Sequence, residues 1–413
     1  MRAHSGWKFY GWWGIVLPAF LIIWTTNGLT LNGVAVFDEK VLGELGVSVG
    51  ALKFRELIQL GTAAIVAPLI GWLADRHGVR PFMVFGAVVL AVALYLYSSI
   101  DSIGDVYWIH FLMGTTLACC GLVLCVVIVS RWFVDRRGLA LGLMLAGTSL
   151  GNSLYPGLNT WLIESYGWRP AFAYISAIPL LLVPLILLAI KEWPQRLGLQ
   201  AYSSAQPATA STQETGASVE NRALSYGDIL RSPNFWFLGL AAFFTFYSIL
   251  GLSSNLFLHA RQLDYSPPEA AKLFLPLFLL GIVGKVGFGW FADRAGVKLA
   301  WAVSLGLMLA GALLLATLER ELVLAGVSLF GLGWGGNYSL LQLLTADVFG
   351  ARSIGKAMGA INVLDAGGGA LGPFVTGVLY DVSGNYQLGF GVIVALVALA
   401  MVMLVLVRLP HKA

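Results

Sequence analysis

The sequence predicts an all-α integral membrane protein whose twelve transmembrane helices form two six-helix bundles. Three observations predict this fold: the composition, the length of the apolar stretches and an internal repeat. Of the 413 residues, 58% are hydrophobic and only 11% are charged, whereas soluble domains carry about 25% charged residues. Lipid is therefore the solvent for most of the surface. Disorder, disulfide-rich secretion and nucleic-acid binding are excluded as classes.

Twelve apolar stretches are long enough to be membrane spans. About 20 helical residues cross ~30 Å of hydrocarbon, and stretches of this length without alternation indicate helices rather than the strands of a barrel. The predicted spans are residues 10–36, 49–74, 81–100, 106–130, 138–163, 168–190, 233–258, 268–292, 299–317, 322–345, 355–380 and 388–407.

The first span is expected to be a retained helix, because no small-residue cleavage site lies at signal-peptide distance. Most of the 25 Lys and Arg residues fall on the side of the membrane that holds the N terminus. The positive-inside rule then places both termini in the cytoplasm. We expect a cell inner (plasma) membrane, because the loops are compact and no targeting signal is evident.

The longest hydrophilic segment divides the chain in two. Residues 1–190 are predicted to form an N-terminal bundle and residues 233–413 a C-terminal bundle. The segment between them, residues 191–232, is rich in Ser, Thr, Ala and Gln at its centre. Such a composition cannot bury enough apolar surface to order itself, so we expect a cytoplasmic linker.

The two halves repeat each other. Residues 71–80 read GWLADRHGVR and residues 289–298 read GWFADRAGVK. The fifth and eleventh spans also match, with a proline late in each, Pro156 and Pro373. A duplicated six-helix unit explains both matches. Parallel repeats of this kind are typical of a transporter architecture that binds its substrate near the membrane midplane between the halves.

The repeated decapeptide resembles the G-x-L-A-D-R-x-G-R/K signature of the major facilitator superfamily. Residues 131–147, RWFVDRRGLALGLMLAG, are similar to the fifth-helix signature of the monocarboxylate transporters and of the oxalate/formate antiporter family. The tetrapeptide YGWW at residues 10–13 is similar to the other signature of that branch. These resemblances imply a secondary transporter of small organic anions that works by alternating access.

Charged residues at the cytoplasmic helix ends are candidates for conformational gating. A carboxylate there can interact with a helix N terminus or a basic residue and so latch the halves together in the outward-facing state. The alternative is a set of loop charges that only obeys the positive-inside rule. The predicted gating residues are Asp75, Arg76, Asp293, Arg294, Arg131, Arg136 and Arg137.

Glycines of the fifth and eighth spans are expected to form contacts between the bundles, because small residues permit close and mobile helix packing. The alternative is static packing. The glycines concerned are Gly138, Gly142, Gly147, Gly151, Gly281, Gly284 and Gly289.

Two ionisable residues lie in mid-span, Lys285 and Asp365. Such a charge costs ~2.5 to 3.5 kcal/mol to insert and indicates function. The resemblance implies that Lys285, four residues before Gly289, binds the substrate carboxylate where that branch carries an Arg. We expect Asp365 to pair with Lys285 in the empty state and to take a proton when substrate displaces it. The alternative is a permanent salt bridge.

Six further polar residues are predicted to contact substrate, and each could instead bond a neighbouring helix. They are Asn27, Tyr155, Tyr247, Asn255, Asn337 and Tyr338. The charges at the outer end of the second span, Lys53, Arg55 and Glu56, are interpreted as interfacial side chains that extend toward water. The alternative is that they attract anions at the mouth of the transport path.

The predicted function is proton-coupled symport of a small organic monocarboxylate. The alternatives are an organic anion antiporter, an exporter of a larger amphipathic acid and a transporter-like receptor. No catalytic motif or metal-ligand spacing occurs in the sequence, so we expect neither an enzyme nor a cofactor or metal. The expected partners are the anion, a proton and the bilayer, with the chain acting as a monomer.

Overall fold

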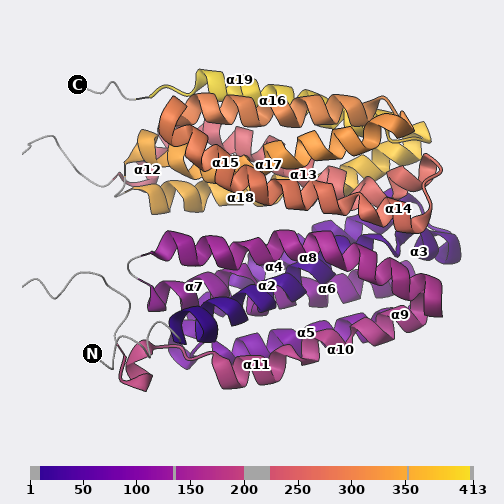
Figure 1. The fold of residues 1–413 in the computed structure, drawn as a ribbon, viewed down its shortest axis with the longest axis horizontal. Helices are drawn as coiled ribbons and strands as arrows, with labels where there is room; N and C mark the ends of the chain where they lie inside the picture. Colours follow the sequence, from indigo (N-terminus) through magenta and orange to yellow (C-terminus); the bar gives the residue numbers. More distant parts are fainter. Residues whose placement is uncertain (1–9, 134–135, 200–223, 351–352, 410–413) are drawn as a thin grey trace, which may run out of the picture.

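The computed structural model describes residues 10–133, 136–199, 224–350 and 353–409, and helices account for almost all of them. Figure 1 shows two bundles lying side by side, one from each half of the chain. The N-terminal bundle contains η1 (Trp12–Val16), α2 (Leu17–Gly28), η2 (Leu29–Gly33), α3 (Asp38–Leu45), α4 (Val49–His77), α5 (Arg80–Tyr97), α6 (Ile103–Cys120), α7 (Leu122–Trp132), α8 (Arg137–Tyr166), α9 (Trp168–Ile175), α10 (Ala177–Leu180) and α11 (Leu182–Ala189). After the short η3 (Pro194–Leu197) and α12 (Tyr226–Arg231), the C-terminal bundle contains α13 (Pro233–Gln262), α14 (Pro267–Lys272), α15 (Phe274–Ala295), α16 (Val297–Ala316), α17 (Arg320–Phe349), α18 (Ile354–Ser383) and α19 (Gln387–Leu406).

The predicted spans are confirmed as helices, with ends shifted by a few residues. Within the described chain, nine helical stretches are long and apolar enough to cross a membrane. The other three predicted spans are α8, α17 and α18, each 30 residues long. Their buried positions include many glycines and several Asn, Ser and Thr residues, which lowers their apolar character although their length suffices to span.

The repeated decapeptide ends a helix in both halves, and its glycine explains why. Gly78 follows α4 with a φ of 87°, and Gly296 follows α15 with a φ of 90°. Only glycine adopts these angles without strain. The arginine of each copy also repeats its contact, since Arg76 lies 4.0 Å over the ring of Trp72 and Arg294 lies 3.9 Å over that of Trp290.

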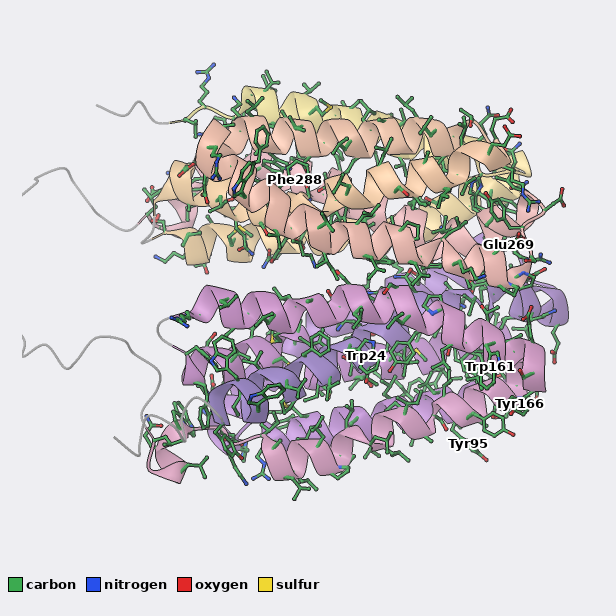
Figure 2. The ribbon with its side chains drawn as sticks, viewed as in Figure 1. Trp24, Tyr95, Trp161, Tyr166, Glu269 and Phe288 are labelled. Atoms are coloured by element: carbon green, nitrogen blue, oxygen red, sulfur yellow. The ribbon has the colours of Figure 1, made fainter. Side chains whose placement is uncertain are left out.

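Exposed aromatic side chains lie at both ends of the N-terminal bundle. Tyr95, Trp161 and Tyr166 are exposed and lie at one end of the bundle pair (Figure 2). Exposed Trp13, in η1, and exposed Trp72, near the end of α4, lie at the other end of the same bundle. Tyr and Trp gather at membrane–water interfaces because one edge of the ring system is polar, so these positions agree with the predicted spans.

The two ends of the molecule differ in how the bundles meet. We call the end that carries α3 and α14 the α3 end, and the opposite one, which carries α12, the α12 end (Figure 1). Helices α4 and α18 meet across the interface, as do α8 and α15. At the α3 end the approach is close: a Cβ atom added to Gly377 of α18 would lie 3.2 Å from the Cα atom of Gly50 in α4.

The prediction that glycines of the fifth and eighth spans form contacts between the bundles is wrong for this structure. Gly147 and Gly151 pack against α2, and Gly281 and Gly284 pack against α17, in each case within one bundle. A Cβ atom added to the remaining three would meet no described atom within 4 Å; these are Gly138, Gly142 and Gly289. Small residues allow close packing of any helix pair, and here the closest pairs lie inside the bundles.

Candidate functional site

Lys285 lies near the middle of α15 and reaches across the interface to the other bundle. Its Nζ atom donates a hydrogen bond to the Oγ atom of Ser149 in α8, at 2.9 Å. Among the described residues no carboxylate lies within 4.0 Å of this nitrogen, since none of the ion pairs includes it. An ammonium group has three donors, and a hydroxyl satisfies one without neutralising the charge. The site can therefore accept an anion.

Asp365 lies in α18 and is 8% exposed. One orientation of the Asn362 amide donates to its Oδ2 atom at 3.3 Å, and Tyr338 of α17 interacts electrostatically with the carboxylate. These neighbours belong to the C-terminal bundle, whereas Lys285 points to the N-terminal one. The expected ion pair between Lys285 and Asp365 is accordingly not formed in this structure.

Two predicted substrate contacts hold the C-terminal bundle together instead. Asn255 donates to the carbonyl of Gly251 at 2.9 Å, and the hydroxyl of Tyr386 donates to its Oδ1 atom at 3.5 Å. Asn337 accepts from the indole of Trp301 at 2.7 Å and donates to Thr245 at 3.0 Å. Both amides are fully buried, so in the described state they bond neighbouring residues of their bundle, which is the alternative given for them above.

The remaining predicted contacts have partners within their own bundles, and none of their printed hydrogen bonds or ring contacts reaches Lys285. Tyr155 of α8 donates to the Oγ1 atom of Thr25 in α2 at 3.4 Å. Asn27 donates to its neighbour Thr26 within α2 at 3.5 Å. Tyr247 is buried in α13. The ring of Tyr338 packs edge-on against Phe246, with 5.9 Å between centroids.

Tyr155 and the partly buried Trp24 also line a groove of about 430 Å³ within the N-terminal bundle (Figure 2 labels Trp24). Its walls are otherwise almost entirely apolar: Leu21, Thr25, Leu158, Ile178, Leu181, Leu182 and Leu185. Leu181 is 70% exposed, so the groove opens toward lipid rather than toward the bundle interface.

The predicted gating residues gather at the α12 end, where they form contacts within single bundles. Asp75 of α4 lies 3.3 Å from Arg131 of α7, and both belong to the N-terminal bundle. Arg136 precedes α8 with a φ of 57°, and both Arg137 and Asp293 are exposed. Over the described ranges, no hydrogen bond joins the two bundles on this side of Lys285.

The α3 end contains charged residues that the sequence interpretation placed wrongly. Lys53 and Arg55 of α4 are 0% and 1% exposed, so they are not interfacial side chains. The Nζ atom of Lys53 lies 2.6 Å from one carboxylate oxygen of Asp38, and Arg55 donates to the other. Glu56 is also buried, 3.7 Å from Lys53. The sequence does carry a signal for this cluster. Three charged residues occur in the first turns of the apolar span 49–74, and Asp38 follows the end of the preceding span.

This cluster bonds directly to the C-terminal bundle. Lys53 donates to the backbone carbonyl of Ser254 in α13 and, at 2.7 Å, to its hydroxyl oxygen, while that hydroxyl donates to Glu56. Two further bridges lie at the same end. The carboxylate of Asp381 accepts from the backbone nitrogens of Val49 and Gly50, at 2.9 and 2.7 Å, and Arg261 binds Glu39 at 2.8 Å.

Comparisons with known proteins agree with this architecture. A sequence model described as the Major Facilitator Superfamily matches residues 13–373. Monocarboxylate transporter 13 of Bos taurus is 28% identical over 417 residues, which covers 97% of this chain and 90% of the relative. The oxalate:formate antiporter of Oxalobacter formigenes is 27% identical and covers 87% of this chain and 84% of its own length.

The structure is also similar to solved ones. A crystal structure of a bacterial homologue of the human lysosomal transporter Spinster, in an inward-facing and occupied conformation, superimposes with a TM-score of 0.73. The two chains are 15% identical, and the match covers 94% of each. At that identity the likeness shows the fold.

Proposed function

The chain belongs to the Major Facilitator Superfamily, a family of transporters, and we propose that it is a proton-coupled symporter of a small organic monocarboxylate such as lactate or pyruvate. Its relatives include monocarboxylate transporters and an oxalate:formate antiporter, which supports an organic anion as substrate. The proposal places it in a cell inner membrane as a monomer, with both termini in the cytoplasm and bundles at residues 1–190 and 233–413.

The observation that carries the proposal is the environment of Lys285. This cation lies at mid-membrane between the bundles and is bonded only to the Ser149 hydroxyl among the described residues. An uncompensated charge at this depth is costly unless a ligand shares it, and a substrate carboxylate supplies the missing charge. The ammonium group acts as a point charge, which suits a monoanion.

Asp365 is the proposed proton carrier. It is nearly buried and has no cationic partner within the described ranges, so its protonation removes a costly buried charge. Loading of one proton and one monoanion then neutralises Asp365 and Lys285, both of the C-terminal bundle, before the bundles reorient. With the termini in the cytoplasm, the α12 end is the inner one, and the described state, whose bundles are bonded to each other at the α3 end, faces inward in this proposal.

A second candidate is exchange of one organic anion for another. It is favoured by the similarity to the oxalate:formate antiporter and requires only Lys285. The two functions differ in their dependence on a proton gradient, because exchange through Lys285 alone moves no proton. Export of a larger amphipathic acid is a variant of the same proposal.

The test is uptake into liposomes that contain the purified protein. Labelled lactate, pyruvate, formate, oxalate and an aromatic acid are offered with and without an inward proton gradient. We expect gradient-driven accumulation of a monocarboxylate that Lys285→Gln abolishes and Asp365→Asn uncouples from the gradient. Lys272→Gln, an exposed lysine of α14, is the matched control.

Three results would contradict this assignment. Uptake that survives in Lys285→Gln would show that Lys285 is not the anion site. Accumulation that still depends on the proton gradient in Asp365→Asn would show that Asp365 is not the proton carrier. Exchange without any pH dependence favours the antiporter.

A further inference from the structure

The two bundles are joined at the α3 end by a buried lysine that the proposed transport site does not use. Lys53 belongs to the N-terminal bundle and Ser254 to the C-terminal one, and both are at most 4% exposed. Lys53 donates to both oxygens of Ser254. The contact is thus a charge-assisted bond made in a site from which water is excluded, where such bonds are strongest.

The position of Lys53 is fixed from within its own bundle. Asp38 accepts from both Lys53 and Arg55, and Arg55 also donates to the hydroxyl of Tyr97 at 3.3 Å. That hydroxyl contacts His110 at 3.3 Å, all within the N-terminal bundle. The lysine therefore stays in place when the bundles separate, and only its bonds to Ser254 have to break.

The neighbouring backbone is shaped to admit the lysine. A Cβ atom on Gly377 of α18 would lie 3.1 Å from the Cγ atom of Lys53 and 3.2 Å from the Cα atom of Gly50. Glycine thus leaves room for the side chain to pass between α4 and α18. Beside it, Asp381 of α18 binds the first backbone nitrogens of α4, so the same two helices hold the closed end on either side of the lysine.

Opening of this end removes several partners at once. Lys53 loses both oxygens of Ser254, and Glu56 loses the hydroxyl that donates to it. Asp38 and Glu56 remain beside the lysine, so opening leaves no unpaired buried charge. The contact can therefore break and reform in each transport cycle, whereas loss of one charged member would be strongly destabilising.

From this arrangement we propose that Lys53 is the gating residue of the α3 end. Its bonds to Ser254 hold that end closed while substrate exchanges at the α12 end. The proposal rests on alternating access between the two bundles. It does not rest on the identity of the substrate or on proton coupling at Asp365.

The test measures the separation of the bundles at the α3 end in the full chain, in liposomes and without substrate. Spin labels are placed at Glu164→Cys on α8 and Glu319→Cys before α17, two exposed positions of opposite bundles. The three native cysteines are buried, and the protein without added cysteines gives the labelling background. The test variant combines Lys53→Met with Glu56→Gln, which removes one charge of each sign. Lys272→Met is the matched control at an exposed lysine of the same end.

We expect the double variant to raise the ratio of long to short distances about tenfold, with the control unchanged. Ser254→Ala retains every charge and the backbone carbonyl, so it should fold and shift the distances in the same direction by a smaller factor. Unchanged distances in Ser254→Ala together with unchanged distances or misfolding in the double variant would overturn the proposal. Anion uptake is read separately, so a failure of Lys285 as the substrate site would not mimic this result.

Discussion

Lys53 and Lys285 are both lysines within membrane-spanning helices, and both reach across the interface to a serine of the other bundle. They differ in what neutralises them. Lys53 has Asp38 at 2.6 Å and Glu56 at 3.7 Å, whereas Lys285 has no carboxylate partner in the part of the chain that the structure describes. The comparison teaches that compensation, more than depth, separates a lysine that holds the fold from one available to a ligand.

The largest expected effect is on stability at the compensated lysine. Asp38→Asn leaves Lys53 and Arg55 as buried cations without their shared carboxylate, and breaking a buried pair in this way costs about 3 to 5 kcal/mol. Thermal unfolding in detergent should show a strong decrease in the melting temperature. Adding Arg55→Gln restores the balance of charge and should recover part of the loss. Equal stability of Asp38→Asn and the wild type would mean that the cluster does not contribute as described.

The difference between the two lysines can be tested by placing a carboxylate beside Lys285, as Asp38 lies beside Lys53. Ser149→Asp places a carboxylate where Lys285 now meets a hydroxyl, so the lysine should bind it in preference to a substrate anion. We expect the apparent affinity for the transported anion to fall about tenfold or more, equivalent to ~1.4 kcal/mol, as measured by uptake at varied concentration. Ser149→Ala, which adds no charge, is the control and should have the smaller effect. Undiminished affinity in Ser149→Asp would show that Lys285 does not contact the substrate.

A smaller effect is expected at the α12 end, where no hydrogen bond between described residues joins the bundles. A Cβ atom on Gly142 meets no described atom within 4 Å, so Gly142→Leu should leave the melting temperature nearly unchanged. The added side chain should hinder closure of the α12 end and slow transport several-fold, about 1 kcal/mol in the barrier. Gly306→Leu, also at an open position but on the peripheral α16, serves as the control. A normal transport rate in Gly142→Leu would show that this face stays open throughout the cycle.

The smallest effect concerns an exposed ion pair, the counterpart of the buried one. Glu44 lies outside the spans, and its hydrogen bond with Arg169 lowers the pKa of the carboxyl group below its usual value. A lowered folded-state pKa stabilises the protein above the unfolded-state pKa, and the contribution disappears as the pH falls through the folded-state pKa. Wild type should therefore melt slightly above Glu44→Gln at pH 7, with the difference lost in acid. A constant difference at every pH would exclude the ion pair as its cause.

The sequence predicted the spans and the repeat well because both depend on local composition. Residues 71–80 and 289–298 needed no tertiary information to be matched, and Lys285 was conspicuous because its surroundings are apolar. Hydropathy reports the depth of a residue along a helix but not which way its side chain points. For that reason Lys53 was interpreted as interfacial, although it is fully buried.

The same limitation explains the asparagines. Successive residues of a helix turn by about 100°, so an amide such as Asn337 faces either the interface or a neighbouring helix according to a rotation that the sequence pattern did not fix. The buried partners of Asn337, Trp301 and Thr245, come from two other helices. Only the packed bundle brings these three residues together.

The balanced composition of the cluster at the α3 end also bears on how the protein responds to membrane voltage. One unit charge moved across 100 mV changes the energy by about 2.3 kcal/mol. Lys53 and Arg55 are matched by Asp38 and Glu56, so displacement of this group through the field performs no net electrical work. Lys285 and Asp365 have no such compensating partners within the described ranges, so electrical recordings would report on the charges of these two residues and their cargo.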